Sequence, residues 1–383
     1  MDHTEMVRYL LDIGVNPFDN KVLKSALPYH PQMLQLLFDK GRERRAVPKC
    51  IGAYVLKRVM VESLGDPMAL DALLEAQAVN FIALEDADYE DSDDMDDNTD
   101  GTEYGHLTPL GLALVSISKH RETNPWMVKR LLQAGSDPNR VARSTGTKWA
   151  TNAKDRIITS YTGLMLAIET ARKDIVQLLI DHGADFNKKP HFTVKRTPLQ
   201  YAAELGNLDI VRMLLDRGAD VNEEPALRSG GTALQFAASS GNCNIAVELL
   251  NHGALLGSLP SKVNGRWPLE AAGEHGRLDM IQLLWNMRAK IIGDVDGFER
   301  RHCLRAMNFA RENGHRGCID LISELSEIPV DSLDDENYGA PWLAYSGQDR
   351  VLRKLFRPVG TEHHSRHGEM RYLDPFCATE HFS

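Results

Sequence analysis

The stretch Arg196-Thr-Pro-Leu-Gln-Tyr-Ala-Ala-Glu-Leu-Gly-Asn-Leu-Asp-Ile-Val-Arg-Met-Leu-Leu-Asp-Arg-Gly-Ala-Asp-Val-Asn-Glu223 predicts two short helices in succession. Thr197 can cap the first helix with its hydroxyl, and Pro198 can fill the first helical position, where its missing N–H costs nothing. Gly206 and Gly218 can adopt the left-handed conformation that ends a helix. Each helix is about ten residues long, which is too short to persist alone in water. The pair must therefore bury its apolar faces against copies of itself.

Copies of this helix pair recur along the chain at a fixed step of 35 residues. A fixed period near 33–35 residues with two helices per repeat is typical of a solenoid, in which each repeat contacts only its neighbours. The framework positions that keep the step are Thr162, Thr197, Thr232 and Trp267; Leu164, Leu199, Leu234 and Leu269; Gly183, Gly218 and Gly253; and Gly206, Gly241 and Gly276.

Two short motifs in these repeats resemble the ankyrin repeat. Thr108-Pro-Leu110 and Thr197-Pro-Leu199 match its T-P-L signature, and Gly218-Ala-Asp-Val-Asn222 matches its G-A-D-V-N ending. The resemblance is specific over residues 104–291, and the segment 267–280 is similar to ankyrin arrays of large filamentous-fungal proteins. It implies an all-α ankyrin-repeat solenoid of stacked helix-turn-helix units with hairpin-like loops.

We expect four parts along the chain. The first repeat lacks its first helix, so we also expect that Met1 begins a fragment of a longer protein or is a misassigned start. The stretch 85–103 holds eleven acids and no base, and this density of like charge favours disorder. The expected parts are degenerate ankyrin-like helical repeats at 1–84, an acidic disordered insertion at 85–103, ankyrin repeats at 104–327 with an insertion at 140–160, and a C-terminal tail at 328–383.

The composition narrows the class of protein. The formal net charge of −10 comes almost wholly from the acidic insertion, so the repeats present no dominant basic field and we expect no nucleic-acid contact. No apolar run approaches the roughly 18 residues of a membrane-spanning helix. The five cysteines are scattered and odd in number, which favours an intracellular, reducing compartment, cytoplasm or nucleus.

No pattern in the chain predicts catalysis, a cofactor or a metal site. The segment Asp96-x-Asn98-x-Asp100-Gly101 copies half of a calcium loop, but Leu107 stands where the bidentate glutamate is expected. The histidines of the tail fit no standard zinc spacing. His302, Cys303, His315 and Cys318 lie in the last repeat, where packing explains them better than zinc does.

The resemblance instead points to a binding surface. In ankyrin proteins the hairpin tips and the exposed end of each first helix line a groove that binds protein partners, so we expect a non-catalytic scaffold or adaptor. We expect it to be a monomer or to self-associate weakly. The residues that the resemblance places in the groove are Tyr161, Glu169, Thr170, Thr193, Val194, Arg196, Glu204, Leu205, Arg228, Ser229, Ser239, Ser240, Val263, Asn264, Arg266, Glu274 and His275.

Two other functions stay open from the sequence. The array could be the regulatory or targeting portion of a larger multidomain effector whose catalytic or DNA-binding domain lies outside this chain. The tail could alternatively hold an enzyme or metal site of its own. The reading frame upstream of Met1 would test whether the array belongs to a larger effector. Metal analysis of the purified protein would test the site in the tail.

Overall fold

The structure is a computed structural model in which the residues described are 108–119, 125–145, 159–190, 194–291 and 295–334, with the single positions 5, 8, 9, 12–14, 36, 39, 40, 70, 71 and 74 before them. Contacts divide the chain into two units, Met1–Tyr338 and Gly339–Ser383. All the described residues belong to the first unit. The predicted acidic insertion, and the tail beyond residue 334, lie outside the described residues.

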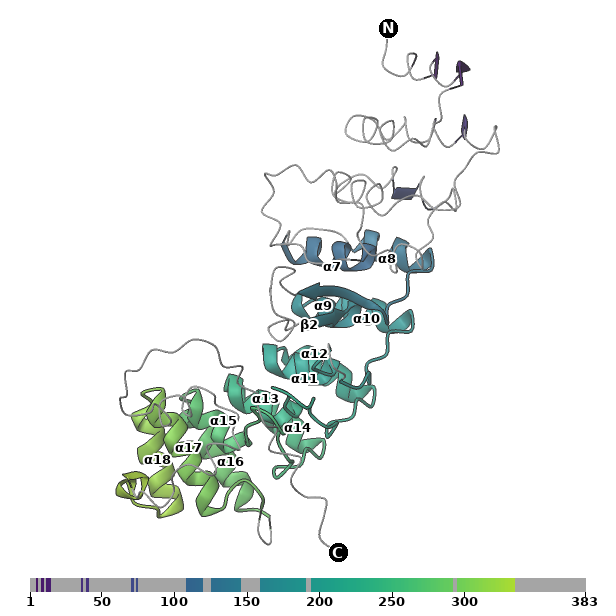
Figure 1. Cartoon of the computed structure of the whole chain (residues 1–383). Coiled ribbons are helices and arrows are strands. Elements are labelled where there is room, and N and C mark those ends of the chain that lie inside the picture. The colour runs from purple at the N-terminus through teal and green to yellow at the C-terminus, as the bar shows by residue number, and fades with distance from the viewer. Residues whose placement is uncertain are drawn as a thin grey trace, which may run out of the picture. The chain divides into compact units, whose positions relative to one another are not determined.

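The described residues fold into helices that follow one another in pairs (Figure 1). The helix period read from the sequence therefore describes the fold correctly, and the predicted all-α solenoid is confirmed. The pairs are α7 (Pro109–Lys119) with α8 (Trp126–Gln133), α9 (Gly163–Glu169) with α10 (Lys173–Asp181), α11 (Pro198–Leu205) with α12 (Leu208–Asp216), α13 (Ala233–Ser240) with α14 (Cys243–Asn251), α15 (Pro268–Glu274) with α16 (Leu278–Arg288), and α17 (Arg300–Glu312) with α18 (Arg316–Ser326).

The first helix of each central repeat begins with a reciprocal cap. The hydroxyl of Thr197 accepts a hydrogen bond from the backbone N of Gln200 at 3.1 Å, and the Gln200 Oε1 accepts one from the Thr197 N at 3.0 Å. Thr232 and Gln235 repeat this arrangement at the start of α13. Such a box satisfies two backbone donors that a helix start otherwise leaves unpaired. Gly206 ends α11 with φ 80°, as its place in the repeat predicts.

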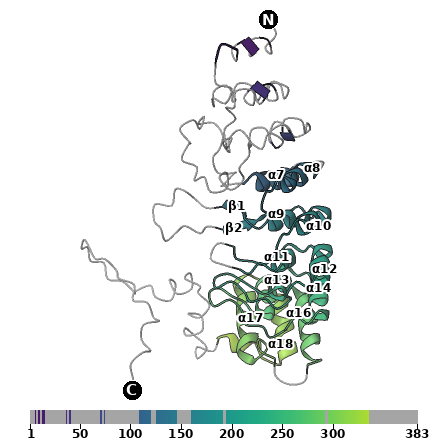
Figure 2. The same cartoon turned by 90° about the vertical axis from the view of Figure 1, so that its right-hand side faces the viewer.

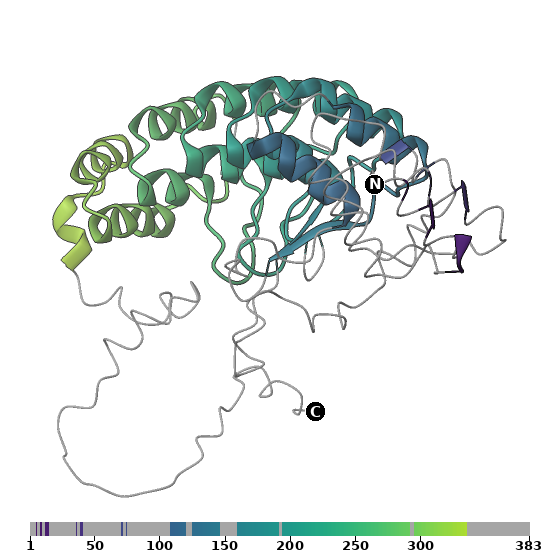
Figure 3. The same cartoon turned by 90° about the horizontal axis from the view of Figure 1, so that it is seen from above.

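The helices form two layers with the core between them. The first helices α9, α11, α13, α15 and α17 contact one another in order, and the second helices α10, α12, α14, α16 and α18 do the same. The two rows are seen side by side in Figure 3, where the hairpin loops project from the side of the first helices. Ala202 of α11 and Leu214 of α12 are both fully buried at 0% exposure between these layers. Each helix pair thus needs its neighbours, as the short helices require.

An asparagine at the base of three successive hairpin loops ties each of these loops to the next repeat. The Asn187 Oδ1 accepts from the backbone N of Asp220 at 3.0 Å, and its Nδ2 donates to the Gly218 carbonyl at 3.4 Å. Asn139 and Asn222 make the equivalent two bonds in the repeats before and after. The last asparagine of the ankyrin-like ending therefore links repeats, a role that the sequence pattern alone does not reveal.

The two ends of the predicted insertion at 140–160 form an antiparallel hairpin. Strand β1 (Val141–Thr145) pairs with β2 (Thr159–Thr162), and Figure 2 shows both strands beside α9. The backbone of β1 lies against α7, where a Cβ on Gly111 would meet the Ala142 carbonyl oxygen at 2.1 Å. Strand β2 ends at Thr162, directly before α9 begins at Gly163. Residues 146–158 lie outside the described residues.

The packed part of the array extends a little past residue 327, where we placed the start of the tail. Ile328 is buried in the core, and its carbonyl accepts a hydrogen bond from the Ser323 hydroxyl at 2.7 Å. A short 3-10 helix, Val330–Asp334, contacts α17 and α18. The apolar face of the last helix pair needs a cover, and these residues supply part of it.

Few residues before 108 are described, so the degenerate repeats predicted at 1–84 stay a prediction. Leu70 is buried in the same core as the later repeats. Asp71 forms an ion pair with Arg130 of α8, with 2.5 Å between Oδ1 and Nε. The chain near residue 70 therefore packs against the first described helix pair.

We expect Ala171→Gly to raise the free energy of unfolding by about 0.5–1 kcal/mol. Ala171 has φ 56° at the position that Gly206 and Gly241 occupy in later repeats. A Cβ in the left-handed region is strained, and glycine relieves that strain. Urea unfolding measures the difference. The matched control is Ala134→Gly, because Ala134 ends α8 with φ −80° and should lose stability. If Ala171→Gly were no more stable than the unchanged protein, Ala171 would not be strained in the left-handed region.

Candidate functional site

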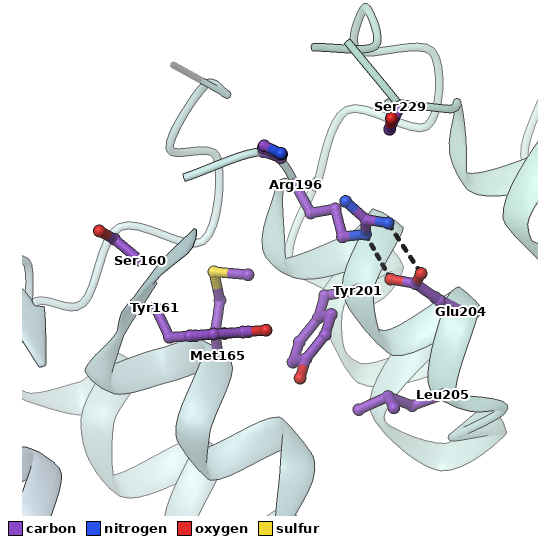
Figure 4. A pocket seen from close by; sticks show the side chains of 9 residues that line it. Ser160, Tyr161, Met165, Arg196, Tyr201, Glu204, Leu205 and Ser229 are labelled. Carbon is purple, nitrogen blue, oxygen red and sulfur yellow. Dashed lines mark hydrogen bonds and ion pairs between the residues drawn. The ribbon is translucent and has the colours of Figure 1, made fainter. Parts of the chain in front are cut away.

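The hairpin loops and first helices enclose a hollow of about 410 Å³ between β2, α9 and α11 (Figure 4). Five of the predicted groove residues, which are Tyr161, Arg196, Glu204, Leu205 and Ser229, line it. The structure thus brings together predicted side chains that are up to 68 positions apart in the sequence, from Tyr161 to Ser229. The complete lining is Ser160, Tyr161, Met165, Lys195, Arg196, Tyr201, Glu204, Leu205 and Ser229.

The floor of the hollow is apolar and is organised by two tyrosines. The ring centroids of Tyr161 and Tyr201 lie 5.8 Å apart with the planes tilted at 52°, a favourable aromatic arrangement. The Tyr201 hydroxyl donates to the Glu169 Oε1 at 2.5 Å. Met165 also lines the hollow, as Figure 4 shows. Glu169 was predicted to bind a partner, and in the structure it orients one wall of the hollow.

Arg196 and Glu204 form the opposite rim by pairing with each other. The Arg196 guanidinium donates through Nε and Nη2 to both carboxylate oxygens of Glu204, with 2.8 Å between Nη2 and Oε1. The same guanidinium lies over the ring of Phe236 in the next repeat, 4.6 Å from the ring centroid. An arginine held by a carboxylate and a ring is strongly pre-organised. This rim is therefore rigid before any partner arrives.

The same device recurs two repeats later. Arg266 pairs with Glu274 at 2.7 Å between Nε and Oε2, and its guanidinium lies 4.2 Å from the ring centroid of Phe309. The repeat between them has Gly231 and Ser239 at the equivalent positions and cannot form the pair. All four charged residues were predicted as groove residues. The structure adds that their charges already compensate each other, which sequence spacing did not indicate.

The remaining predicted residues divide between helix ends and loop tips. The Thr170 hydroxyl donates a hydrogen bond to the Ala167 carbonyl at 2.6 Å, and the Ser240 hydroxyl donates one to the Ala237 carbonyl at 3.2 Å. The Ser239 Oγ lies 3.4 Å from the Nδ1 of His275. One placement is wrong: Val194 is only 1% exposed, because its side chain packs into the core rather than the groove. Thr193 lies outside the described residues.

Two neighbouring hairpin tips are joined through their backbones. The Ser229 N donates to the Val263 carbonyl at 2.8 Å, and the Val263 N donates to the Leu227 carbonyl at 3.1 Å. Arg228 and Asn264, both exposed, stand on these joined tips. Ser229 has φ 52° and Asn264 φ 59°, so both tips turn through the left-handed region. The tips consequently form one continuous edge rather than separate loops.

A buried charge cluster lies between the last two repeats, away from the hollow. Glu270 occupies the buried position that Gln200 and Gln235 hold in earlier repeats, and it is itself 0% exposed. Its Oε1 lies 3.0 Å from the His302 Nδ1 and 3.2 Å from the Arg305 Nε. Burial lowers the pKa of Arg305, and the Glu270 charge opposes that shift. The cluster joins α15 to α17.

The three cysteines that the structure describes are not activated nucleophiles, because burial raises the pKa of each thiol. Burial raises the pKa of the Cys303 thiol to about 11, which keeps it protonated near neutral pH. Within the described ranges, no group of three or more His, Cys, Asp and Glu side chains could hold a metal ion. No helix among the same residues is long and apolar enough to cross a membrane. The tail histidines lie outside these ranges, so their role stays a prediction.

Sequence reasoning missed Ser160, Met165, Lys195 and Tyr201 as lining residues. One signal for the aromatic wall was available, because Tyr201 and the equivalent Phe236 replace the alanine found at position 271. An aromatic ring at that position can accept an arginine from the preceding repeat. Nothing in the repeat pattern marks the other three.

A family model of ankyrin repeats, in three copies, matches residues 115–225 of the chain. The matched span runs from within α7 to beyond α12 and contains most of the hollow. The comparison with curated proteins finds no match. Ankyrin repeats generally mediate protein–protein interaction and are typically non-catalytic. The predicted similarity to fungal arrays stays a prediction.

Proposed function

We propose that this array of ankyrin repeats is a non-catalytic scaffold or adaptor that binds a protein partner along the hairpin tips and first helices. The observation that carries the proposal is the hollow between α9 and α11, which lies on the face where the sequence placed the groove. The partner would insert one large side chain into the hollow, and the backbone around that side chain would contact the surrounding rim.

The composition of the hollow supports an anchor site for a protein. Binding energy at interfaces concentrates where a large side chain enters a well-packed apolar pocket surrounded by polar groups. Met165 and the tyrosine pair supply the apolar floor, while Ser229 and the ion pair of Arg196 with Glu204 supply the polar rim. A volume of about 410 Å³ is sufficient for an aromatic side chain together with part of its backbone.

The rigidity of the site supports the same function. Binding costs less when the receptor is already ordered, because fewer side chains lose freedom on association. Arg196 is held by Glu204 and by the Phe236 ring, and Tyr201 is held by Glu169. Hydrogen bonds from Asn139, Asn187 and Asn222 hold neighbouring loops to each other. The surface is therefore prepared before binding.

Two exposed aliphatic residues provide a matched test. Leu205 lines the hollow and is 44% exposed, whereas Val247 is 39% exposed on α14 in the layer of second helices. A photo-crosslinking amino acid at position 205 should trap a protein, and the same group at position 247 should not. Mass spectrometry identifies the trapped protein, whose affinity is then measured against the full chain.

Leu205→Asp should weaken binding of that protein about tenfold or more, since it places a charge on the apolar wall. Val247→Asp should leave the affinity within about twofold, and thermal unfolding should show both variants folded. Equal crosslinking at the two positions, or equal affinity of the two variants, would rule out the hollow as the binding site.

A further inference from the structure

We propose that the segment that this surface binds is acidic: an extended stretch of a separate protein with aspartate or glutamate residues following one aromatic or aliphatic anchor. The anchor enters the hollow, and the acids lie on the hairpin tips. This inference rests on the proposed function and names the chemistry of the partner.

The hairpin tips carry only positive charge. Residues 194–196, 227–229 and 262–264 include four basic side chains and no acid. Arg196 is neutralised by Glu204. Lys195, Arg228 and Lys262 make no ion pair with any residue that the structure describes. We call these three residues the tip cations.

Four acids of the first helices and their ends near the tip cations are already engaged. Glu204 and Glu274 are each paired with the arginine eight positions before them. Glu169 accepts the hydrogen bond of Tyr201, and Glu270 is fully buried among His302 and Arg305. In the loop that carries Arg228, Glu223 is paired with Lys189, and Glu224 is exposed without an ion pair to the described residues. Three tip cations therefore outnumber this one acid, and the net charge along the tips is positive although the whole chain is acidic. Charge complementarity of this kind steers association and selects partners.

The tip cations form one row that starts at the hollow. Lys195 and Ser229 both line the hollow. Ser229 follows Arg228, and its backbone N bonds to Val263, the neighbour of Lys262. The row thus crosses three successive repeats. Packed helices stand about 8–10 Å apart, and an extended chain advances about 3.3 Å per residue. Acidic residues about three positions apart in the partner would meet successive tip cations.

Apolar contacts favour a peptide over a polyanion. Leu227 is 62% exposed beside Arg228, and Leu205 is 44% exposed in the hollow. A nucleic acid would leave these leucines without a matching surface, and three cations are few for phosphate-dominated binding. A protein segment with both acids and an apolar anchor satisfies the whole surface.

Selection from a phage library of random dodecapeptides on the full chain tests the inference. We expect enrichment of peptides with one aromatic or aliphatic residue followed by acids at intervals near three. Binding of a selected peptide should weaken at higher ionic strength. The triple change Lys195→Glu, Arg228→Glu and Lys262→Glu should lower its affinity about tenfold or more.

The matched control is Lys129→Glu, Lys173→Glu and Lys290→Glu, because these exposed lysines lie on or next to the second helices α8, α10 and α16. It applies the same change of net charge away from the tips and should leave the affinity within about twofold. Circular dichroism and thermal unfolding of both triple variants check that they fold.

The outcomes separate this inference from the proposed function. Selected peptides that depend on Leu205 but are basic or neutral, or that are insensitive to the tip triple variant, would overturn the acidic partner and leave the scaffold function standing. Tighter binding of a single-stranded DNA or RNA oligonucleotide than of any peptide would also overturn it. Peptides insensitive to Leu205→Asp would overturn both proposals.

Discussion

Leu214→Ala is expected to lower the free energy of unfolding by about 2–5 kcal/mol. Leu214 lies in α12 with 0% exposure, and it belongs to the core between the two helix layers. Truncating it removes apolar contacts and leaves a cavity that the neighbouring repeats cannot fully close. Because each repeat is stabilised by its neighbours, the loss should reduce the cooperativity of unfolding across the array. Urea unfolding followed by circular dichroism measures both effects.

Leu259→Ala is the matched control for this change. Leu259 lies in a hairpin loop and is 72% exposed, so the same truncation removes little buried surface. It should change the free energy of unfolding by less than about 0.5 kcal/mol. A loss at Leu214 as small as that at Leu259 would show that the apolar face of α12 had been assigned wrongly.

Glu270→Ala is expected to lower the free energy of unfolding by about 3–5 kcal/mol. The carboxylate lies next to His302 and Arg305, and it also accepts a hydrogen bond from the Trp267 backbone N at 3.3 Å. Removing it leaves the Arg305 charge buried without its carboxylate, which costs far more than an exposed ion pair. Hydrogen exchange should show faster opening of α17 and α18 than of α11 and α12.

The equivalent change Gln235→Ala separates the buried charge from the helix cap. Gln235 closes the same reciprocal cap in α13 and donates to the Ser258 carbonyl at 2.9 Å, but no charge depends on it. Its loss should cost about 1–2 kcal/mol. Equal effects of the two variants would mean that Glu270 acts only as a cap and that Arg305 relaxes towards water.

The helix pairs were predictable because their causes are local or periodic. Thr197 with Pro198 starts a helix, Gly206 ends one, and the step of 35 residues requires neighbours that bury the apolar faces. The repeat period also predicted most of the loop residues that are exposed. Val194 is the exception, since an apolar residue at a loop position turned into the core once the neighbouring helices supplied a place for it.

The sequence by itself therefore determined the repeat, the layers and the face that carries the loops, because helix starts, helix ends and a period need only nearby residues. Only the tertiary structure decided which charges remain available on that face. The Arg196 guanidinium meets Glu204 and Phe236, whereas Lys195, one residue earlier, is left beside the hollow without an ion pair to the described residues. Pairing depends on distances between repeats of a few ångströms, and spacing along the chain does not encode them.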